Sequence, residues 1–98
     1  MASGDSRIFK GAYVGTGGAL SIDAPGFKPR FVILINTSDP ALSIHIEGMA
    51  DASAWTQEAG TTAFTTTQCV TLDDAGFNVG TDVQLNASGD VIHYICGS

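Results

Sequence analysis

The fold class of this 98-residue chain is decided by the stretch Phe31-Val32-Ile33-Leu34-Ile35. It is continuously apolar, rich in β-branched residues and too short for a buried helix, so it predicts a β-strand with both faces covered. Phe31, Ile33 and Ile35 share one face of such a strand, and Val32 and Leu34 share the other. One face can fill the core of the domain. The other face then requires a second layer, a neighbouring subunit or another protein surface.

Short segments with strand character lie on both sides of this stretch, each bounded by residues that favour turns. We expect further strands at residues 7–14, 20–23, 43–47, 68–72, 77–79 and 90–96, and β-structure in the threonine-rich run 61–67. After a kink at Gly80, residues 81–85 are expected to continue the strand that begins at Phe77. Many short strands at this spacing predict an all-β fold, a single-domain antiparallel β-sandwich or barrel-like fold.

Alternation of apolar and polar residues predicts which side chains face the core. In the strand expected at 43–47, it places Ile44 and Ile46 inward. In the last strand, it places His93 and Cys96 on opposite faces of the sheet. A Cys-His pair for nucleophilic catalysis is therefore not expected there.

Residues 49–59 are the ambiguous stretch. Their alanine, methionine, glutamine and glutamate content favours a helix, which Asp51 or Ser53 could cap. An extended loop fits the same residues equally well, so we allow one short helix here. Trp55 is the only tryptophan, and we expect it to anchor this segment on a sheet edge or on a partner.

The chain has few charged residues, and they are unevenly distributed along it. The net charge is −6, and the basic residues all lie in the first 30 positions: Arg7, Lys10, Lys28 and Arg30. Direct contact with nucleic acid is not expected, because neutralising phosphates requires clustered Lys and Arg. One interpretation is simply an acidic soluble protein. The other is a basic N-terminal edge that meets an acidic neighbour.

Residues 1–6 are small and polar and predict a flexible arm before a single domain at 7–98. No segment approaches the roughly 20 consecutive apolar residues of a membrane span. The first residues also lack the basic and apolar regions of a signal peptide. We therefore expect synthesis in a bacterial cytoplasm, where Cys69 and Cys96 stay thiols and act as small buried hydrophobic residues.

The remaining polar residues form no catalytic or metal-binding signature. His45 and His93 each sit in a strand without a second ligand two or four positions away. Asp73-Asp74 could join a calcium site with Asp82 or Asn78, but the spacing differs from that of a dedicated calcium loop. We expect no enzymatic activity, no cofactor and no metal site.

Several short motifs occur in a fixed order along the chain, namely Tyr13-x-Gly15-x-Gly17, Gly26-Phe27-Lys28-Pro29-Arg30-Phe31-Val32, Asn36-x-x-Asp39, Glu47-Gly48-Met49-Ala50, Gly76-Phe77-x-Val79-Gly80, Asn86-x-Ser88-Gly89 and Tyr94. The set spans roughly residues 8–96 and resembles small β-sandwich virion structural proteins of tailed bacteriophages. The resemblance implies a structural role in the virion and no enzymatic activity. Related domains look like head decoration proteins in some cases and like tail or fibre modules in others.

The first hypothesis is a capsid decoration (cement) protein that binds the major capsid protein and stabilises the head shell. The chain is short, starts at Met1 and carries no fibre stalk or coiled coil, so we expect it to act as an assembly unit. A homo-oligomer is expected, a trimer before a dimer. The alternative is a tail or fibre module that binds a host surface or glycan through Trp55, Gln57 and Glu58. The candidate interface residues are Arg7, Lys10, Lys28, Arg30, Phe31, Ile33, Ile35 and Trp55.

Overall fold

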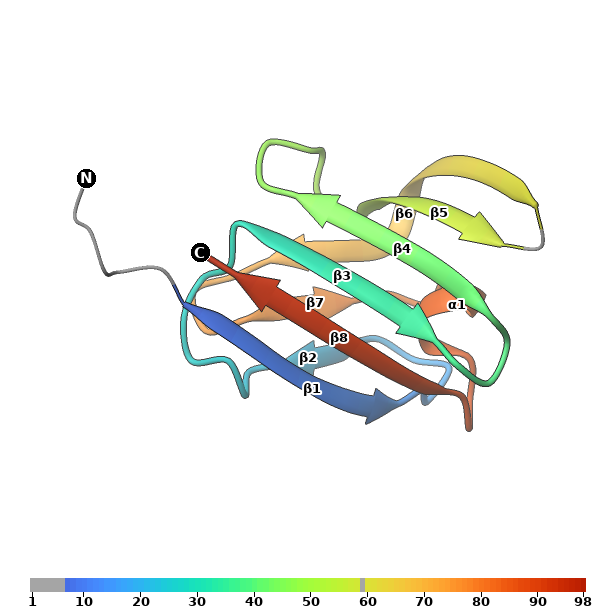
Figure 1. Ribbon diagram of the computed structural model, residues 1–98, viewed down its shortest axis with the longest axis horizontal. Helices are drawn as coiled ribbons and strands as arrows, with labels where there is room; N and C mark the ends of the chain where they lie inside the picture. The colour runs from blue at the N-terminus through green and yellow to red at the C-terminus, as the bar shows by residue number, and fades with distance from the viewer. Residues whose placement is uncertain (1–6, 59) are drawn as a thin grey trace.

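A computed structural model describes residues 7–58 and 60–98 and shows one curled antiparallel sheet (Figure 1). The elements are β1 (Ile8–Val14), β2 (Leu20–Ile22), β3 (Phe31–Asn36), β4 (Ala41–Ile46), β5 (Ser53–Glu58), β6 (Thr61–Leu72), β7 (Phe77–Val79), α1 (Val83–Asn86) and β8 (Val91–Gly97). Their order across the eight-stranded sheet is β1-β8-β3-β4-β5-β6-β7-β2. The predicted all-β class is confirmed. The flexible arm predicted at residues 1–6 lies outside the described residues.

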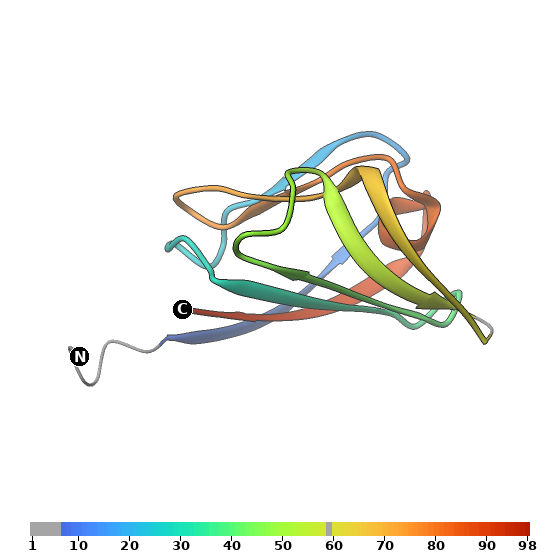
Figure 2. The ribbon, with the colours of Figure 1, turned by 90° about the horizontal axis from the view of Figure 1, so that it is seen from above.

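The sheet curls into a half-barrel with two layers (Figure 2). β1, β8, β3 and β4 form one layer, and β2 and β7 lie in the other. β5 continues the first layer by pairing with β4, and β6 belongs to both layers: its first half pairs with β5, and its last residues, 70–72, pair with β7. The strand changes direction at Gln68, whose φ of 61° is in the left-handed region. A register shift between Ser53 and Ala54 on β5 absorbs the extra residues of β6.

β3 is the central strand of the first layer, between β4 and β8. Its Val32 and Leu34 side chains are fully buried, and they meet Val70, Phe77 and other core residues from the second layer. Ile35, on the opposite face of the strand, is 46% exposed. The two residue sets predicted for this strand therefore lie in two different environments.

Leu34→Ala is expected to lower the free energy of unfolding by about 3 kcal/mol, because it removes buried methyl groups and leaves a cavity. Ile33→Ala is expected to cost less than half as much, because Ile33 lies on the outer face and is only partly buried. Urea denaturation of the two variants at one protein concentration measures the difference. Equal losses would contradict the assignment of only one face to the core.

The helix allowed at residues 49–59 is wrong. Residues 53–58 form β5, which pairs with β4 on one side and β6 on the other. Ala52 has a φ of 63°, which a helix cannot contain, so the chain turns there and enters the sheet. Two rows of backbone partners outweigh a helix propensity of a few tenths of a kcal/mol per residue.

The strand predicted at 81–85 is also wrong, because residues 83–86 form the short helix α1. The Asp82 side chain caps it by accepting a hydrogen bond from the Gln84 N–H at 2.9 Å. In contrast, the segments predicted separately at 61–67 and 68–72 are one continuous strand, β6. The predicted alternation of the last strand is confirmed, since Ile92, Tyr94 and Cys96 are buried.

The predicted inward direction of Ile44 and Ile46 on β4 is wrong. Ser43 and His45 point inward and are buried, whereas Ile46 is 52% exposed. The reason is the register with β3: His45 pairs with Val32, and Ile44 pairs with Ile33. Because paired residues share a face, burying Val32 in the core places His45 beside it and Ile44 outside.

Candidate functional site

The outer face of the first layer carries a row of paired side chains that crosses six strands. The strand registers align Lys10, Ile95, Ile33, Ile44, Trp55 and Phe64 from β1 to β6. Five of these six side chains are apolar, and none is fully buried. Directly opposed side chains on one face of a sheet lie within contact distance of their neighbours. The row is therefore a continuous apolar surface.

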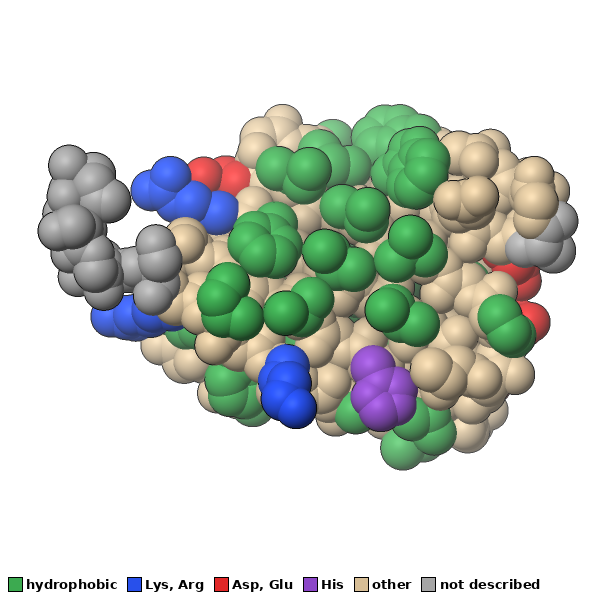
Figure 3. Space-filling view, in the orientation of Figure 1, with side chains coloured by type: hydrophobic (Ala, Val, Ile, Leu, Met, Phe, Trp, Pro, Cys, Tyr) green, Lys and Arg blue, Asp and Glu red, His purple; other side chains and the backbone are tan. Residues whose placement is uncertain are grey.

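Further apolar residues flank this row on both sides. Phe31 pairs with Ile46 and Ile35 pairs with Leu42, so β3 and β4 present apolar pairs along their length. We call this surface the outer apolar face; it consists of Ile8, Ala12, Val14, Phe31, Ile33, Ile35, Leu42, Ile44, Ile46, Trp55, Phe64 and Ile95. Figure 3 shows apolar side chains spread across this side of the molecule, with basic side chains and a histidine at its borders.

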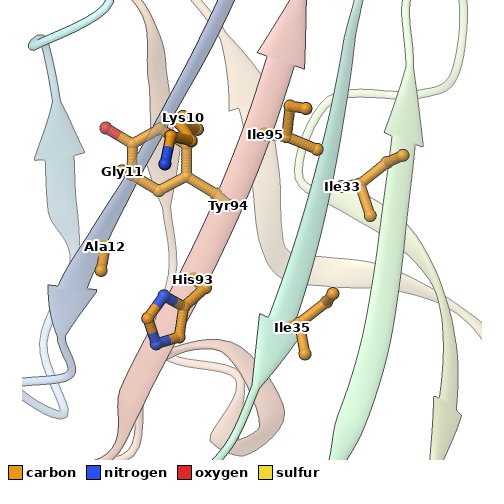
Figure 4. Close-up of a pocket in the computed structure, with 8 residues that line it drawn as sticks. All are labelled: Lys10, Gly11, Ala12, Ile33, Ile35, His93, Tyr94 and Ile95. Atoms are coloured by element: carbon orange, nitrogen blue, oxygen red, sulfur yellow. The ribbon is translucent and has the colours of Figure 1, made fainter.

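A shallow hollow lies within the outer apolar face, across β1, β8 and β3 (Figure 4). The small side chain of Ala12 leaves space on β1, and the Ile33, Ile35 and Ile95 side chains line the other side. Lys10 and His93 supply its polar groups. A hollow of this composition can accept an apolar side chain of a partner, with Lys10 available to a carboxylate or carbonyl at the rim.

The inner face of β4 and β5 has the opposite composition, small and polar. The Ser43 and Thr56 hydroxyls form a buried hydrogen bond of 3.0 Å. The His45 Nδ1 lies 2.8 Å from the Ser53 carbonyl oxygen, and the ring is buried. These strands thus bury polar groups and expose isoleucine, leucine and tryptophan, the reverse of an ordinary half-exposed sheet. Such a face is typical of an interaction surface rather than of free solvent-exposed sheet.

The structure divides the predicted interface residues into two groups. Lys10, Phe31, Ile33, Ile35 and Trp55 lie together on the outer face of β1, β3 and β5. They therefore form part of one surface.

Arg7, Lys28 and Arg30 lie instead at the end of the sheet where the chain terminates. The Arg30 N–H donates to the Gly97 carbonyl and the Ser98 N–H donates to the Arg7 carbonyl. The Arg7 guanidinium lies 5.7 Å from the centroid of the Phe27 ring. Phe27 directly precedes Lys28 in the sequence. A basic end thus borders the apolar face.

Besides Ile8, Val14 and Leu42, sequence reasoning missed four large members of the outer apolar face: Ile44, Ile46, Phe64 and Ile95. Ile44 and Ile46 were assigned to the core from their alternation alone. Phe64 is the only aromatic residue in its threonine-rich run, and its 55% exposure marks it as part of a surface. If the strand order had been known, following the strand registers outward from β3 would have placed all four on one face.

The two cysteines are buried thiols and lie apart from the outer apolar face. Burial, with the Asp82 carboxylate nearby, raises the pKa of the Cys69 thiol to about 12. Burial also raises the pKa of the Cys96 thiol, and Cys96 faces the core while His93 faces solvent. Neither sulfur is thus favoured as a thiolate nucleophile at neutral pH.

The carboxylates considered for calcium serve as local caps. The Asp73 side chain accepts hydrogen bonds of 2.9 Å from both the Ala75 and Gly76 N–H groups. Asp82 caps α1. Within residues 7–58 and 60–98, no group of three or more His, Cys, Asp and Glu side chains converges on a metal-sized site. In the same part of the chain, no helix is long and apolar enough to cross a membrane.

Comparison of the chain with protein-family models, with curated proteins and with solved structures finds no match. The outer apolar face is therefore the feature on which a functional proposal has to rest.

Proposed function

We propose that this protein is an assembly protein of a tailed-phage virion, a capsid decoration protein that covers its outer apolar face by binding the major capsid protein. The observation that carries the proposal is the reversed composition of β4 and β5, with Ser43 and His45 inside and Ile44 and Trp55 outside. Exposing such a face to water is unfavourable by roughly 25 cal/mol for each Å² of apolar surface. Binding a protein surface recovers that free energy.

The choice of a capsid as the partner rests on the resemblance of the ordered motifs to virion structural proteins. The physical features agree with it. A small protein with a broad apolar sheet face and a basic end at Arg7, Lys28 and Arg30 suits a junction between shell subunits, where many copies, each bound weakly, act together. The protein's role is then mechanical: it buries surface at the junction and raises the free energy needed to separate the subunits.

Ile35→Asp is expected to weaken binding to preformed expanded capsids by about tenfold or more, because it places an unpaired charge in the middle of a buried apolar contact. Ile35 is 46% exposed in the free protein, so the melting temperature should change little. Co-sedimentation of purified protein with capsids measures the occupancy, and cryo-electron microscopy of the particle locates the bound copies.

Ala24→Asp is the matched control, because it adds the same charge at an exposed turn away from the outer apolar face. It should bind as the unaltered protein does. Equal binding of Ile35→Asp and the unaltered protein would remove the outer apolar face from the contact. Absence of all binding to capsids would reject the capsid as the partner.

A second candidate function is a tail or fibre module that binds a glycan, and one observation favours it. Trp55 and Phe64 are paired across β5 and β6, and both are exposed. Gln57 lies on the same face two residues from Trp55 and is exposed. Aromatic faces beside an amide are a common way to hold a sugar ring. Glycan-array binding that depends on Trp55, without binding to capsids, would favour this function over the first.

A further inference from the structure

Among residues 7–58 and 60–98, no strand pairs with the outer edge of β1. β1 stands at one end of the strand order, and β8 is its one partner in this part of the chain. The Gly15 N–H donates to Asp90 at one end of this pair, and the Ser98 N–H donates to Arg7 at the other. Backbone groups alternate in an antiparallel pair, so the odd-numbered residues of β1 face β8. The N–H and C=O groups of Ile8, Lys10, Ala12 and Val14 therefore point outward.

The sequence of β1 is complementary to itself about Gly11, its central residue. In an antiparallel pair of two copies centred there, Ile8 lies opposite the partner's Val14 and Lys10 opposite the partner's Ala12. Ile8 is 64% exposed and Val14 is 56% exposed, the highest values among the large apolar side chains that the structure describes. The pairing covers both at once and forms about eight backbone hydrogen bonds.

Other registers of the same edge are less favourable. A pair centred on Lys10 would place Lys10 opposite the partner's Lys10, and like charges in direct opposition destabilise a sheet. A pair centred on Ala12 would leave Ile8 without a partner. Only the pair centred on Gly11 uses all seven residues of β1 and opposes no like charges.

The opposite end of the strand order, β2, is only three residues long, Leu20–Ile22, and offers little edge to pair with. The free side of β6 is also less suited to pairing. Its exposed half, residues 61–67, ends at the bend where Gln68 has a φ of 61°. Bends and bulges of this kind turn an edge away from further strands. The β1 edge has no such interruption, and it also lacks acidic residues in a chain whose net charge is −6. Two copies therefore approach with the least repulsion at β1.

We propose that two copies of this chain associate by antiparallel pairing of β1 with β1 about a two-fold axis at Gly11. The dimer does not depend on what the outer apolar face binds. Because the axis is perpendicular to the sheet, both outer apolar faces lie on the same side and join into one surface. A target with repeated sites then binds two faces at once, which raises the overall affinity without any new contact.

The test uses two variants of one exposed residue, Ala12, which this register places opposite the partner's Lys10. Ala12→Lys is expected to raise the dimer dissociation constant by roughly tenfold, because each dimer then contains two Lys-Lys oppositions. Ala12→Glu is expected to leave the dimer intact or tighten it several-fold at low salt. Sedimentation velocity over a concentration series, up to about 100 μM, gives the constants.

If only net charge mattered, the order of the two dissociation constants would be reversed. The two Ala12 variants therefore distinguish strand pairing from general charge repulsion. Ala12→Lys changes the net charge per chain to −6 + 1 = −5, and Ala12→Glu changes it to −6 − 1 = −7. If general repulsion controlled association, the lysine variant would associate better. That order, equal effects of both variants, or an unaltered protein that is monomeric at 100 μM would overturn the proposal.

Thr62→Lys and Thr62→Glu on the free edge of β6 are the matched controls. Both should dimerise as the unaltered protein does. If instead they change the dissociation constant while the Ala12 variants do not, the β6 edge forms the dimer and the proposal fails. At concentrations low enough for every chain to be monomeric, melting temperatures should be similar in all four variants, because Ala12 and Thr62 are exposed in the single chain.

Discussion

Asn86→Ala is expected to lower the free energy of unfolding by about 4 kcal/mol, because three hydrogen bonds of a fully buried side chain disappear together. The Asn86 Oδ1 accepts from the Thr16 N–H at 2.8 Å. Its Nδ2 donates to the Gly80 carbonyl at 2.8 Å and to the Gly18 carbonyl. One side chain thus joins the turn after β1, the end of β7 and the end of α1. In a domain of this size the melting temperature should fall by more than about 10 °C.

Asn78→Ala is the control, because the Asn78 side chain bonds to the exposed Ser21 hydroxyl on the surface of β2 and β7. It should cost about 1 kcal/mol or less. Asn86→Asp should be at least as harmful as Asn86→Ala at neutral pH, since a buried carboxylate would face two carbonyl oxygens. Thermal and urea unfolding of all three variants measures these differences. A loss below about 1.5 kcal/mol for Asn86→Ala would show that water replaces the three hydrogen bonds.

Gly80→Ala is expected to destabilise the fold by a similar amount, about 4 kcal/mol, through a clash with the backbone. A Cβ at this position would lie 2.5 Å from the Gln68 carbonyl carbon and oxygen and 2.6 Å from the Gln68 Cα. No rotamer change relieves such a contact. β7 and β6 would have to separate where the Gly80 N–H donates to the Cys69 carbonyl at 2.8 Å. Differential scanning calorimetry measures the loss.

Gly18→Ala provides the comparison, because a Cβ at Gly18 meets nothing within 4 Å. Both changes reduce the freedom of the unfolded chain equally, so their difference isolates the clash. Gly18→Ala should be neutral or slightly stabilising. A Gly80→Ala protein that melts within 3 °C of the Gly18→Ala protein would mean that β6 can move aside at Gln68 without loss.

The sequence predicted the elements that local pattern determines. The continuous apolar run at 31–35 became the central strand β3, and the alternation of the last strand gave the correct buried face, including Cys96. Both segments have enough apolar, β-branched residues for their own composition to decide their structure. The all-β class followed from the spacing of such segments.

Properties that depend on strand order could not be predicted. Residues 53–58 form a strand because β4 and β6 flank them, although their composition suits a helix. Ile44 faces outward because of its register with Ile33, which no local alternation reveals. For the same reason, the sequence allowed Trp55 and Ile33 to be proposed individually as contact residues. It did not reveal that both belong to a single row across six strands. The continuous outer apolar face is a property of the assembled sheet.

The pairing of β1 with β8 has a consequence for how the protein folds. Within the part of the chain that the structure describes, residues 8–14 pair only with residues 91–97, and β3 also needs β8 on one side. Such distant partners give a high contact order, which slows folding because a long loop must close before the strands meet. On the ribosome, the first strand has to wait until residues 91–97 have emerged. During that interval the apolar β3 sequence stays unpaired on one edge, so chaperone binding and a low temperature of expression should both raise the yield of native protein.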